Sequence, residues 1–140
     1  MDNLVKFDNP GVLAFIEQLQ GIINRMAANS ANCKVSAVAI LTAVIALSDY
    51  NGTERCMISS VPILLLLLTD SYYLGLERRF KDIYSEFISK IKAGEEPELF
   101  VIPKTSFCDQ MKGLLMGFIS ISTTPFYLLL EGASLIFLFI

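Results

Sequence analysis

Apolar residues recur on one face of a predicted helix along the first third of the chain. Over residues 12–47 they follow alternating steps of four and three positions in one unbroken register, which is the spacing of an amphipathic helix. A capping side chain, from Asp8 or Asn9, precedes Pro10, and proline is favoured at the first helical position. We therefore predict one long helix over residues 10–48, amphipathic in its first half and apolar in its second.

A second long helix is predicted around the stretch from Val61 to Ile91, which changes character halfway along. Its first half is apolar to Leu76 apart from Asp70. Its second half is charged but keeps an apolar row at helical spacing. Turn residues at 49–53 precede the stretch, so the two helices are expected to lie antiparallel across a short turn.

The ends of this second helix follow from proline and glycine. We expect a start near Ser59 or Ser60, because Pro62 then lies in the first turn, where its missing N–H costs nothing. A glycine-containing stop signal at 93–97 predicts an end near Lys92. The helix then continues well beyond its apolar half.

The last quarter of the chain is apolar except for Glu131 and a run of hydroxyls ahead of Pro125. Ser106, with Asp109 three residues on, resembles a capping box and predicts the start of a third helix. Residues 113–140 reach about 42 Å as one straight helix, against a hydrocarbon core of about 30 Å. They therefore tilt, kink at Pro125, or split into an interfacial piece and a span, and the pattern leaves these alternatives open.

The composition is too apolar for a soluble domain of this size. Of the 140 residues, 54% are hydrophobic, and the excess is expected to face lipid. Stretches near the roughly 20 residues of a membrane-spanning helix occur at about 27–48, 57–76 and within 113–140. The predicted fold class is all-α: a single integral membrane domain of three spans. Its first two helices extend as arms, at about 10–26 and 77–92, that pair as an antiparallel cytoplasmic hairpin.

Basic residues set the expected orientation. Only Arg55 lies between the first two spans, whereas seven Lys and Arg residues follow the second. We therefore expect a protein of the cell inner membrane. By the positive-inside rule, its N-terminus and its second connection lie in the cytoplasm. The formal net charge of −3 argues against nucleic acid as a partner, which requires a basic face. The expected partners are the lipid bilayer and further copies of the chain.

The sequence contains none of the patterns that carry catalysis or bind a cofactor. It has no histidine, which is the commonest general base and metal ligand. Cys33, Cys56 and Cys108 are far apart and form no CxxC pair, so we interpret them as apolar packing residues. A glycine-rich phosphate loop is also absent. We predict no enzymatic activity, no cofactor and no metal.

Ionisable side chains of the first two helices are expected to pair. In an antiparallel hairpin about the predicted turn, residues whose numbers sum to about 104 lie at equal depth. Lys34 then faces Asp70, and Arg25 lies near Glu77. A lone charge at a helix centre costs roughly 2.5 to 3.5 kcal/mol on insertion scales, which favours contact between Lys34 and Asp70. Three interpretations of the pair stay open. It fixes the helix register, it takes part in gating or in an ion path, or both side chains extend to the cytoplasmic interface.

Three further features leave alternatives open. Glu131 either lies at the outer interface or belongs to a ring of carboxylates that lines a pore in an oligomer. Apolar residues of the arms, including Phe15, Tyr84 and Ile88, either pack within one chain or join subunits into a ring. The apolar patch Leu99–Ile102 is expected to dock on the arms or on the membrane surface.

Two segments resemble those of small, uncharacterised prokaryotic multi-span membrane proteins. IINRMAANSANCK carries the pattern Arg-Met-Ala-x-Asn-Ser ahead of the first span, and LLLTDSYYLGLERRFKDIY carries Asp-x-Tyr-Tyr-Leu-x-x-Glu-Arg-x-Phe-x-x-x-Tyr leaving the second. The matching residues are Arg25, Met26, Ala27, Asn29, Ser30, Asp70, Tyr72, Tyr73, Leu74, Glu77, Arg78, Phe80 and Tyr84. In size and layout the chain is similar to the two- to four-span membrane effectors of bacterial antiviral systems, which oligomerise and permeabilise or depolarise the inner membrane.

This resemblance implies an oligomeric inner-membrane protein that perturbs or permeabilises the membrane, as a pore-forming effector of antiviral defence. The trigger is expected to come from another protein, because the sequence has no recognisable nucleotide-sensing domain. The alternative function is a non-conducting scaffold or regulatory subunit that recruits a soluble partner through its cytoplasmic arms.

Overall fold

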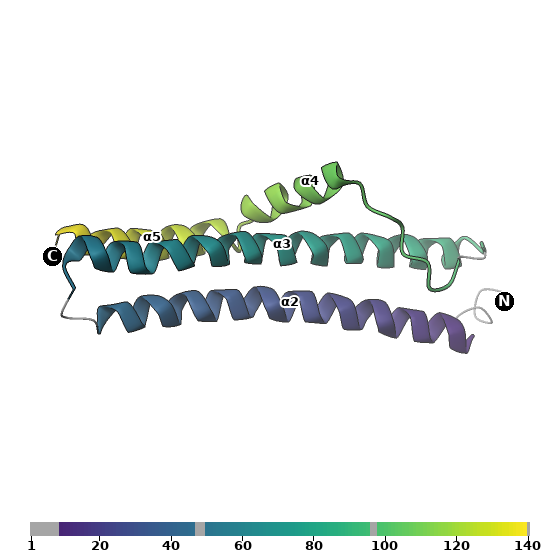
Figure 1. Cartoon of the computed structure of the whole chain (residues 1–140). Helices are drawn as coiled ribbons and strands as arrows, with labels where there is room; N and C mark the ends of the chain where they lie inside the picture. Colours follow the sequence, from purple (N-terminus) through teal and green to yellow (C-terminus); the bar gives the residue numbers. More distant parts are fainter. Residues whose placement is uncertain (1–8, 47–49, 96–97, 140) are drawn as a thin grey trace.

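The protein is helical throughout the part of the chain that the structure describes. The computed structural model describes residues 9–46, 50–95 and 98–139, and these contain no strand. The elements are α2 (Pro10–Ile45), α3 (Gly52–Lys92), α4 (Phe107–Phe118), α5 (Thr124–Ile136) and the 3-10 turn η1 (Phe137–Phe139). Helices α2 and α3 form a long antiparallel hairpin, and α5 runs along α3 (Figure 1). The all-α prediction is confirmed.

Helix α2 begins where the capping signal predicts. Asn9 is its N-cap, and the Asn9 side-chain oxygen accepts a hydrogen bond from the backbone N–H of Gly11 at 2.9 Å. Pro10 is the first helical residue, where proline loses no hydrogen bond. The helix ends at Ile45, and the predicted end at Ser48 lies outside the described residues.

Helix α3 begins earlier than the sequence pattern predicts. The expected start at residues 59–60 is wrong, because the helix starts at Gly52. A capping box forms its first turn: Asn51 Oδ1 accepts a hydrogen bond from the Glu54 N–H at 3.0 Å, and the Glu54 carboxylate accepts one from the Asn51 N–H at 3.2 Å. Pro62 therefore lies inside the helix and removes one backbone donor there.

The predicted end of α3 at Lys92 is confirmed. Gly94 adopts a φ of 79°, a left-handed conformation that glycine reaches without a Cβ clash. Its N–H donates to the Ile91 carbonyl at 3.0 Å, which turns the chain away from the helix axis.

Two apolar clusters hold the α2–α3 hairpin together, and they lie towards its opposite ends. The arm cluster joins buried residues of the first part of α2 to the last part of α3: Val12, Phe15, Leu19, Phe87 and Ile91. The second cluster lies nearer the α2–α3 connection and consists of Ala37, Leu41, Val44, Cys56, Ile63, Leu67, Tyr127 and Phe137. The predicted pairing of the two arms as a helical hairpin is therefore confirmed.

The segment after α3 folds back over the arm cluster. Leu99 packs against the cluster, and the ring of Phe100 contacts that of Phe15 with centroids 5.4 Å apart. Phe100 has a φ of 61°, an uncommon conformation for a residue other than glycine. Docking of the patch Leu99–Ile102 on the arms is thus confirmed for its first two residues.

The apolar residues of the arms pack within the chain to different extents. Phe15 is 1% exposed, and its ring also packs edge-on against Phe87. Tyr84 and Ile88 are half-buried against the same cluster. Phe15 therefore packs within the chain, as the first alternative predicts, and subunit contacts through the half-buried Tyr84 and Ile88 stay a prediction.

The last apolar segment splits into two helices. Helix α4 ends at Phe118, a turn follows, and α5 begins at Thr124 with Pro125 in its first turn. Of the three alternatives that the sequence left open, which were a tilt, a kink and a split into two pieces, the structure has the split. Ser106 is the N-cap of α4 as predicted, but it makes no side-chain capping bond, so the expected capping box is wrong. Asp109 lies instead 4.0 Å from Lys112 Nζ.

Helix α4 docks on α3 through small residues (Figure 1). Gly113 lies against Gly75, and Gly117 lies against the backbone of Ser71. Each helix contributes two small residues one turn apart, the arrangement that permits close backbone approach between helices. A methyl group at Gly75 or Gly117 would meet backbone atoms, which cannot move aside as a flexible side chain can.

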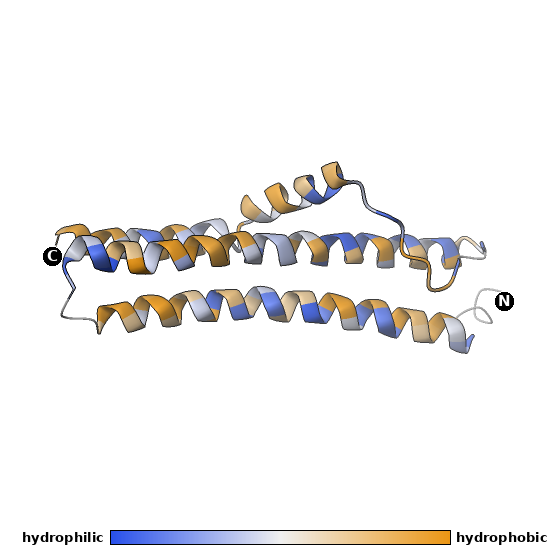
Figure 2. Ribbon diagram, viewed as in Figure 1, coloured by the Kyte–Doolittle hydropathy of each residue, from blue (hydrophilic) through white to orange (hydrophobic). Residues whose placement is uncertain are grey.

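By length and composition, α2 and α3 are each apolar enough to cross a membrane. The segment Thr124–Phe139 is a shorter apolar helix. Apolar residues predominate in the halves of α2 and α3 near their connection, whereas hydrophilic residues are frequent in the arm of α3 (Figure 2). The C-terminal end of α5 lies beside the start of α3, where Gly52 contacts the backbone of Phe137.

The close approach of α4 to α3 predicts different outcomes for two glycine-to-alanine substitutions. A Cβ at Gly75 lies 2.7 Å from the Gly113 carbonyl oxygen, whereas a Cβ at Gly113 meets no atom nearer than 3.7 Å. We expect Gly75→Ala to displace α4, even though alanine favours a helix over glycine by about 1 kcal/mol. We expect Gly113→Ala to leave α4 in place.

Spin labels at Cys108 on α4 and at an introduced Asp82→Cys on α3 report this displacement as a change in their distance distribution. Cys33 and Cys56 are buried and do not compete for the label. The distribution should broaden or shift in Gly75→Ala only. An unchanged distribution in Gly75→Ala would contradict the backbone contact between the two helices.

Candidate functional site

A charged and hydrogen-bonded cluster lies buried between α2 and α3. Lys34 Nζ is 2.5 Å from Asp70 Oδ2, and the Asp70 side chain is 0% exposed while that of Lys34 is 19% exposed. Ser30 Oγ donates to Asp70 Oδ1, and Lys34 Nζ also donates to Ser30 Oγ at 3.2 Å. We call Ser30, Lys34 and Asp70 the Asp70 cluster. The predicted contact between Lys34 and Asp70 is present.

Helical spacing brings this cluster together. Ser30 and Lys34 are one turn apart on α2, so both point at the same place on α3. Each carboxylate oxygen of Asp70 accepts one hydrogen bond, which compensates for its removal from water. Sequence reasoning missed Ser30 as a partner, although its spacing of four residues from Lys34 is the signal that identifies it.

Helix α5 turns a polar face towards the hairpin. Thr123 is 0% exposed and Tyr127 is 1% exposed, and Glu131, one turn further along, is half-buried. We call these three residues the α5 polar row. The opposite face of α5 is apolar and exposed, with Leu128 at 66% and Leu129 at 76%.

The α5 polar row has unused hydrogen-bonding capacity. Among the described residues, Thr123 Oγ1, Tyr127 Oη and Glu131 Oε1 are buried and have no hydrogen-bond partner. Tyr127 lies close enough to Asp70 for the carboxylate charge to act on its hydroxyl. Buried polar atoms of this kind are rare in folded proteins and usually have a functional reason or a bound water. Sequence reasoning identified Glu131 but missed Tyr127, whose neighbours along the chain are all apolar.

Beyond Glu131 the polar face of α5 continues to Ser134. Its hydroxyl shares hydrogen bonds with those of Ser59 and Ser60, the latter at 2.9 Å, and all three are buried or half-buried. Buried polar groups therefore extend from the Asp70 cluster, along α5, to the first turns of α3. None of the described residues forms an ion pair with Glu131.

The predicted pairing of Arg25 with Glu77 is wrong. Glu77 forms its ion pair with Lys81 on the same helix, at 2.5 Å, and its side chain is 12% exposed. Arg25 is exposed on α2. A partner four residues away on the same helix is in reach of Glu77 in any arrangement of the hairpin, so it is favoured over one on the other helix.

The cysteines divide into two kinds. Cys33 and Cys56 are buried, as expected of packing residues, but Cys108 is exposed at the start of α4, so that interpretation is wrong for Cys108. Within residues 9–46, 50–95 and 98–139, no three cysteine or acidic side chains come together as a metal ion requires.

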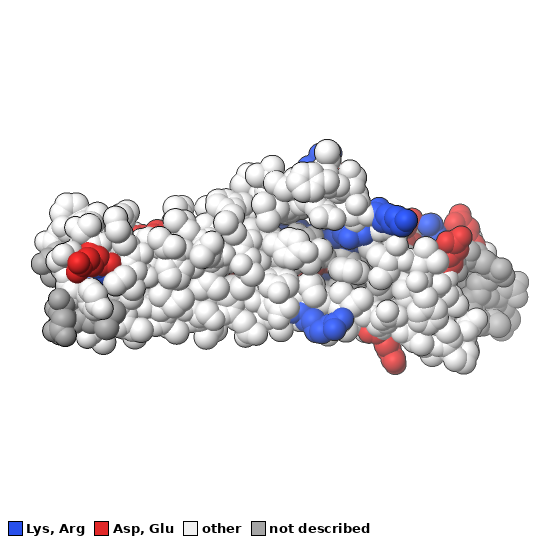
Figure 3. Space-filling view, in the orientation of Figure 1, with Lys and Arg blue, Asp and Glu red and all other residues white. Residues whose placement is uncertain are grey.

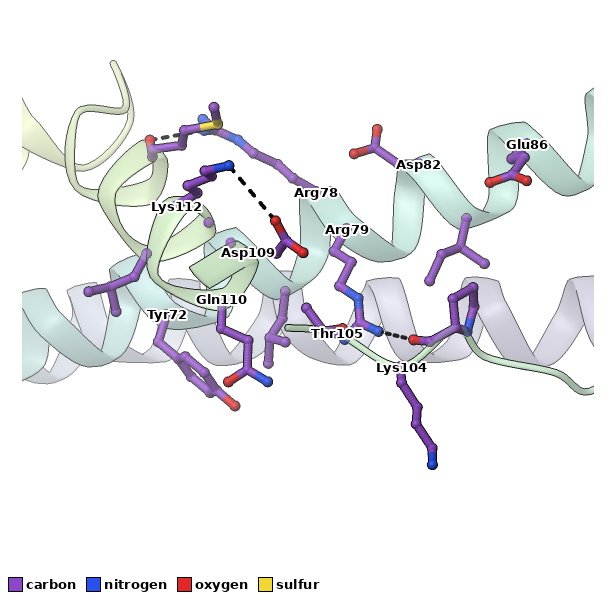
Figure 4. A pocket seen from close by; sticks show the side chains of 17 residues that line it. Tyr72, Arg78, Arg79, Asp82, Glu86, Lys104, Thr105, Asp109, Gln110 and Lys112 are labelled. Carbon is purple, nitrogen blue, oxygen red and sulfur yellow. Dashed lines mark hydrogen bonds and ion pairs between the residues drawn. The ribbon is translucent and has the colours of Figure 1, made fainter. Parts of the chain in front are cut away.

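A cleft lies between α3, α4 and the segment that joins them (Figure 4). We call this the α3–α4 cleft, and its volume is about 420 Å³. Arg78 forms one wall by donating to the Met116 carbonyl at 2.9 Å and to Ser120 Oγ at 3.1 Å. Arg79 forms another by donating to the Pro103 carbonyl at 2.5 Å. The sequence located these arginines next to the second span but gave no sign of the cleft.

Breaking the Asp70 cluster is expected to destabilise the fold. Asp70→Asn leaves the Lys34 ammonium without its carboxylate, and we expect a loss of about 3 kcal/mol in the free energy of unfolding. This value is at the low end for buried pairs because Lys34 still exposes 19% of its side chain. The double variant Lys34→Met/Asp70→Leu removes both charges and should recover most of the loss.

Denaturant titration in detergent micelles of the wild type, Lys34→Met, Asp70→Leu and the double variant forms a double-mutant cycle that measures this coupling. Lys81→Met is the matched control, because its ion pair with Glu77 has a 57% exposed lysine, and it should cost under about 1 kcal/mol. Independent, additive effects of the two single substitutions would contradict a direct interaction between Lys34 and Asp70.

Comparison with known proteins identified no relative. No protein-family model, curated protein or solved structure matches this chain. Function is therefore inferred from the Asp70 cluster, the α5 polar row and the α3–α4 cleft.

Proposed function

We propose that this chain is an integral membrane protein, because many large apolar side chains are exposed while several polar side chains are fully buried. Ser59, Asp70 and Ser134 are each 0% exposed. In contrast, Ile121 is 92% exposed and Val35 is 68% exposed. A protein in water buries its large apolar side chains and exposes its polar ones. The distribution found here suits a molecule whose surface meets lipid, where polar groups face the protein interior.

The lengths of the helices fit partial insertion. Helices of 36 and 41 residues extend over about 54 and 62 Å, roughly twice the 30 Å of a hydrocarbon core. On the face shown in Figure 3, a broad and largely uncharged band lies between the acidic residues at the end next to the α2–α3 connection and the basic residues near the middle of the molecule. We propose that the half of the molecule that carries this band, with α5 and η1 as a third span, lies in the bilayer and that the arms lie in water.

Helix α4 suits the membrane interface. Its first turns carry Asp109 and Lys112, while Leu115 and Met116 further on are more than half exposed. Because α4 runs alongside α3 (Figure 1), its charged first turns lie towards the arms and its apolar end lies towards the apolar half of the hairpin. The basic residues of the second connection favour the cytoplasmic side for the arms and α4, in the inner membrane.

Within this arrangement, we infer that the protein permeabilises the membrane to protons or small cations. The observation that carries this proposal is the α5 polar row, whose buried oxygens lack partners. Unpaired polar atoms at membrane depth are costly, and those that occur usually mark ion or proton pathways. The layout of membrane effectors in antiviral systems, which the sequence resembles, supports the same function.

The route we propose starts at the Asp70 cluster and follows α5. Asp70 is paired within the protomer, so it is unsuited to lining a pore between subunits. Glu131 is only half-buried, and copies of it from several subunits remain candidates for a ring in a homo-oligomer.

A non-conducting scaffold is the second candidate function. It is favoured by the arm hairpin, which has its own apolar cluster and carries exposed charged side chains at Lys81, Glu86 and Lys90. Such a surface suits a soluble protein partner. This function requires that the membrane potential be unaffected by the protein.

Membrane insertion and orientation predict a labelling pattern. After alkaline carbonate extraction the protein should stay with the membrane. A membrane-impermeant maleimide should reach Cys108 only in inverted vesicles, because α4 lies on the cytoplasmic side, and it should reach an introduced Thr53→Cys only in intact cells. Release of the protein by carbonate would contradict insertion, and the reverse labelling would contradict the orientation.

Proton flux tests the proposed permeation. In vesicles that contain a pH-sensitive dye and a potassium diffusion potential, the wild-type protein should admit protons. Glu131→Gln removes a titratable group from the α5 polar row, and its flux should fall to the level of empty vesicles. Glu77→Gln is the control, because it removes the same charge from the arm and should leave the flux unchanged. Equal flux in the wild type and Glu131→Gln excludes the route, and absence of wild-type flux favours the scaffold.

A further inference from the structure

Hydrogen-bond donors border the α3–α4 cleft on both sides. In Figure 4 the side chains of Tyr72, Lys104 and Gln110 extend in one direction from the cleft. Those of Asp82 and Glu86 extend in the opposite direction. Arg78 and Lys112 lie on the side of Asp82 and Glu86, so cationic side chains border the cleft on both sides.

The basic side chains of the cleft are matched mainly by neutral atoms. The Arg79 guanidinium donates to the Pro103 carbonyl and lies 5.9 Å from the centre of the Phe80 ring. Of the three carboxylates that line the cleft, Glu86 pairs with Lys90 at 2.6 Å and Asp109 lies 4.0 Å from Lys112, while Asp82 forms none of the ion pairs among the described residues. An arginine held by one carbonyl retains donors for an anion, and its planar fork matches two phosphate oxygens.

Exposed apolar surface adjoins the cleft. On α3, Leu68 is 47% exposed and Tyr72 is 46% exposed. On α4, Leu115 is 56% exposed and Met116 is 62% exposed. A ligand with its charged group in the cleft therefore has apolar surface beside it on both helices, which a soluble anion does not need.

We propose that the α3–α4 cleft binds the phosphate headgroup of an anionic phospholipid, with Arg79 and Lys104 as its principal contacts. This inference rests on the proposed membrane insertion, which puts the cleft where the apolar part of α3 meets the charged arm. Tyr72 and Gln110 supply further donors for the headgroup. The acyl chains lie along the exposed apolar residues of α3 and α4. Basic pockets at the cytoplasmic side of membrane helices bind lipid headgroups by the same chemistry.

Native mass spectrometry of the full chain, released from micelles that contain equal amounts of phosphatidylglycerol and phosphatidylcholine, tests the proposal. The wild type should retain phosphatidylglycerol preferentially. The double variant Arg79→Gln/Lys104→Gln should lose that preference, by about fivefold for each basic side chain, which is the effect typical of one Lys or Arg near an anionic membrane surface. Arg25→Gln/Lys81→Gln is the matched control, with the same change of charge outside the cleft, and should keep the preference.

Each other outcome overturns the proposal in a distinguishable way. Equal retention by the cleft variant and the control assigns lipid binding to another surface. Displacement of the lipid by millimolar glycerol 3-phosphate assigns the site to a soluble anion. A wild type without lipid preference that still resists carbonate extraction excludes the cleft while leaving membrane insertion intact. Because Lys104 is exposed on a connecting segment, the single variant Lys104→Glu gives the same readout if the double variant fails to fold.

Discussion

The register of the two-helix hairpin depends on the buried pair of Lys34 and Asp70. Apolar side chains on long helices tolerate alternative packing, so burial alone defines the relative position of α2 and α3 weakly. A buried carboxylate is less tolerant, because a shift of one turn takes Asp70 away from at least one of its two partners, Lys34 and Ser30. We therefore propose that the pair also excludes wrong registers, as buried polar residues do in coiled coils.

Once the register is set, small residues determine how closely the other helices approach. Gly117 lies against the backbone of Ser71, and Gly52 lies against that of Phe137, so α4 and the end of α5 both contact α3 at positions without a side chain on one partner. Ser134 adds a hydrogen-bonded contact to Ser59 near the start of α3. The large apolar residues of α5 are thereby turned outward and its polar row is turned inward.

The sequence predicted the long helices, the arm hairpin and the Lys34–Asp70 contact, because each follows from periodicity or from counting residues back from one turn. Local chemistry caused the errors. The capping box at Asn51 lets α3 begin earlier than the position of Pro62 indicates. Glu77 pairs with Lys81 and not with Arg25, because Lys81 lies one turn away on the same helix. The α3–α4 cleft was beyond prediction, because it depends on the angle between two helices and no periodicity encodes an angle.

Arg78 links the two parts of the molecule to which functions are assigned here. It donates to the Met116 carbonyl, near the C-terminal end of α4, where a cation stabilises a helix. It also donates to Ser120, in the turn that precedes α5 and Thr123. Arg78 therefore joins α4, which forms a wall of the α3–α4 cleft, to the turn that leads into α5, so one side chain contacts both parts of the molecule.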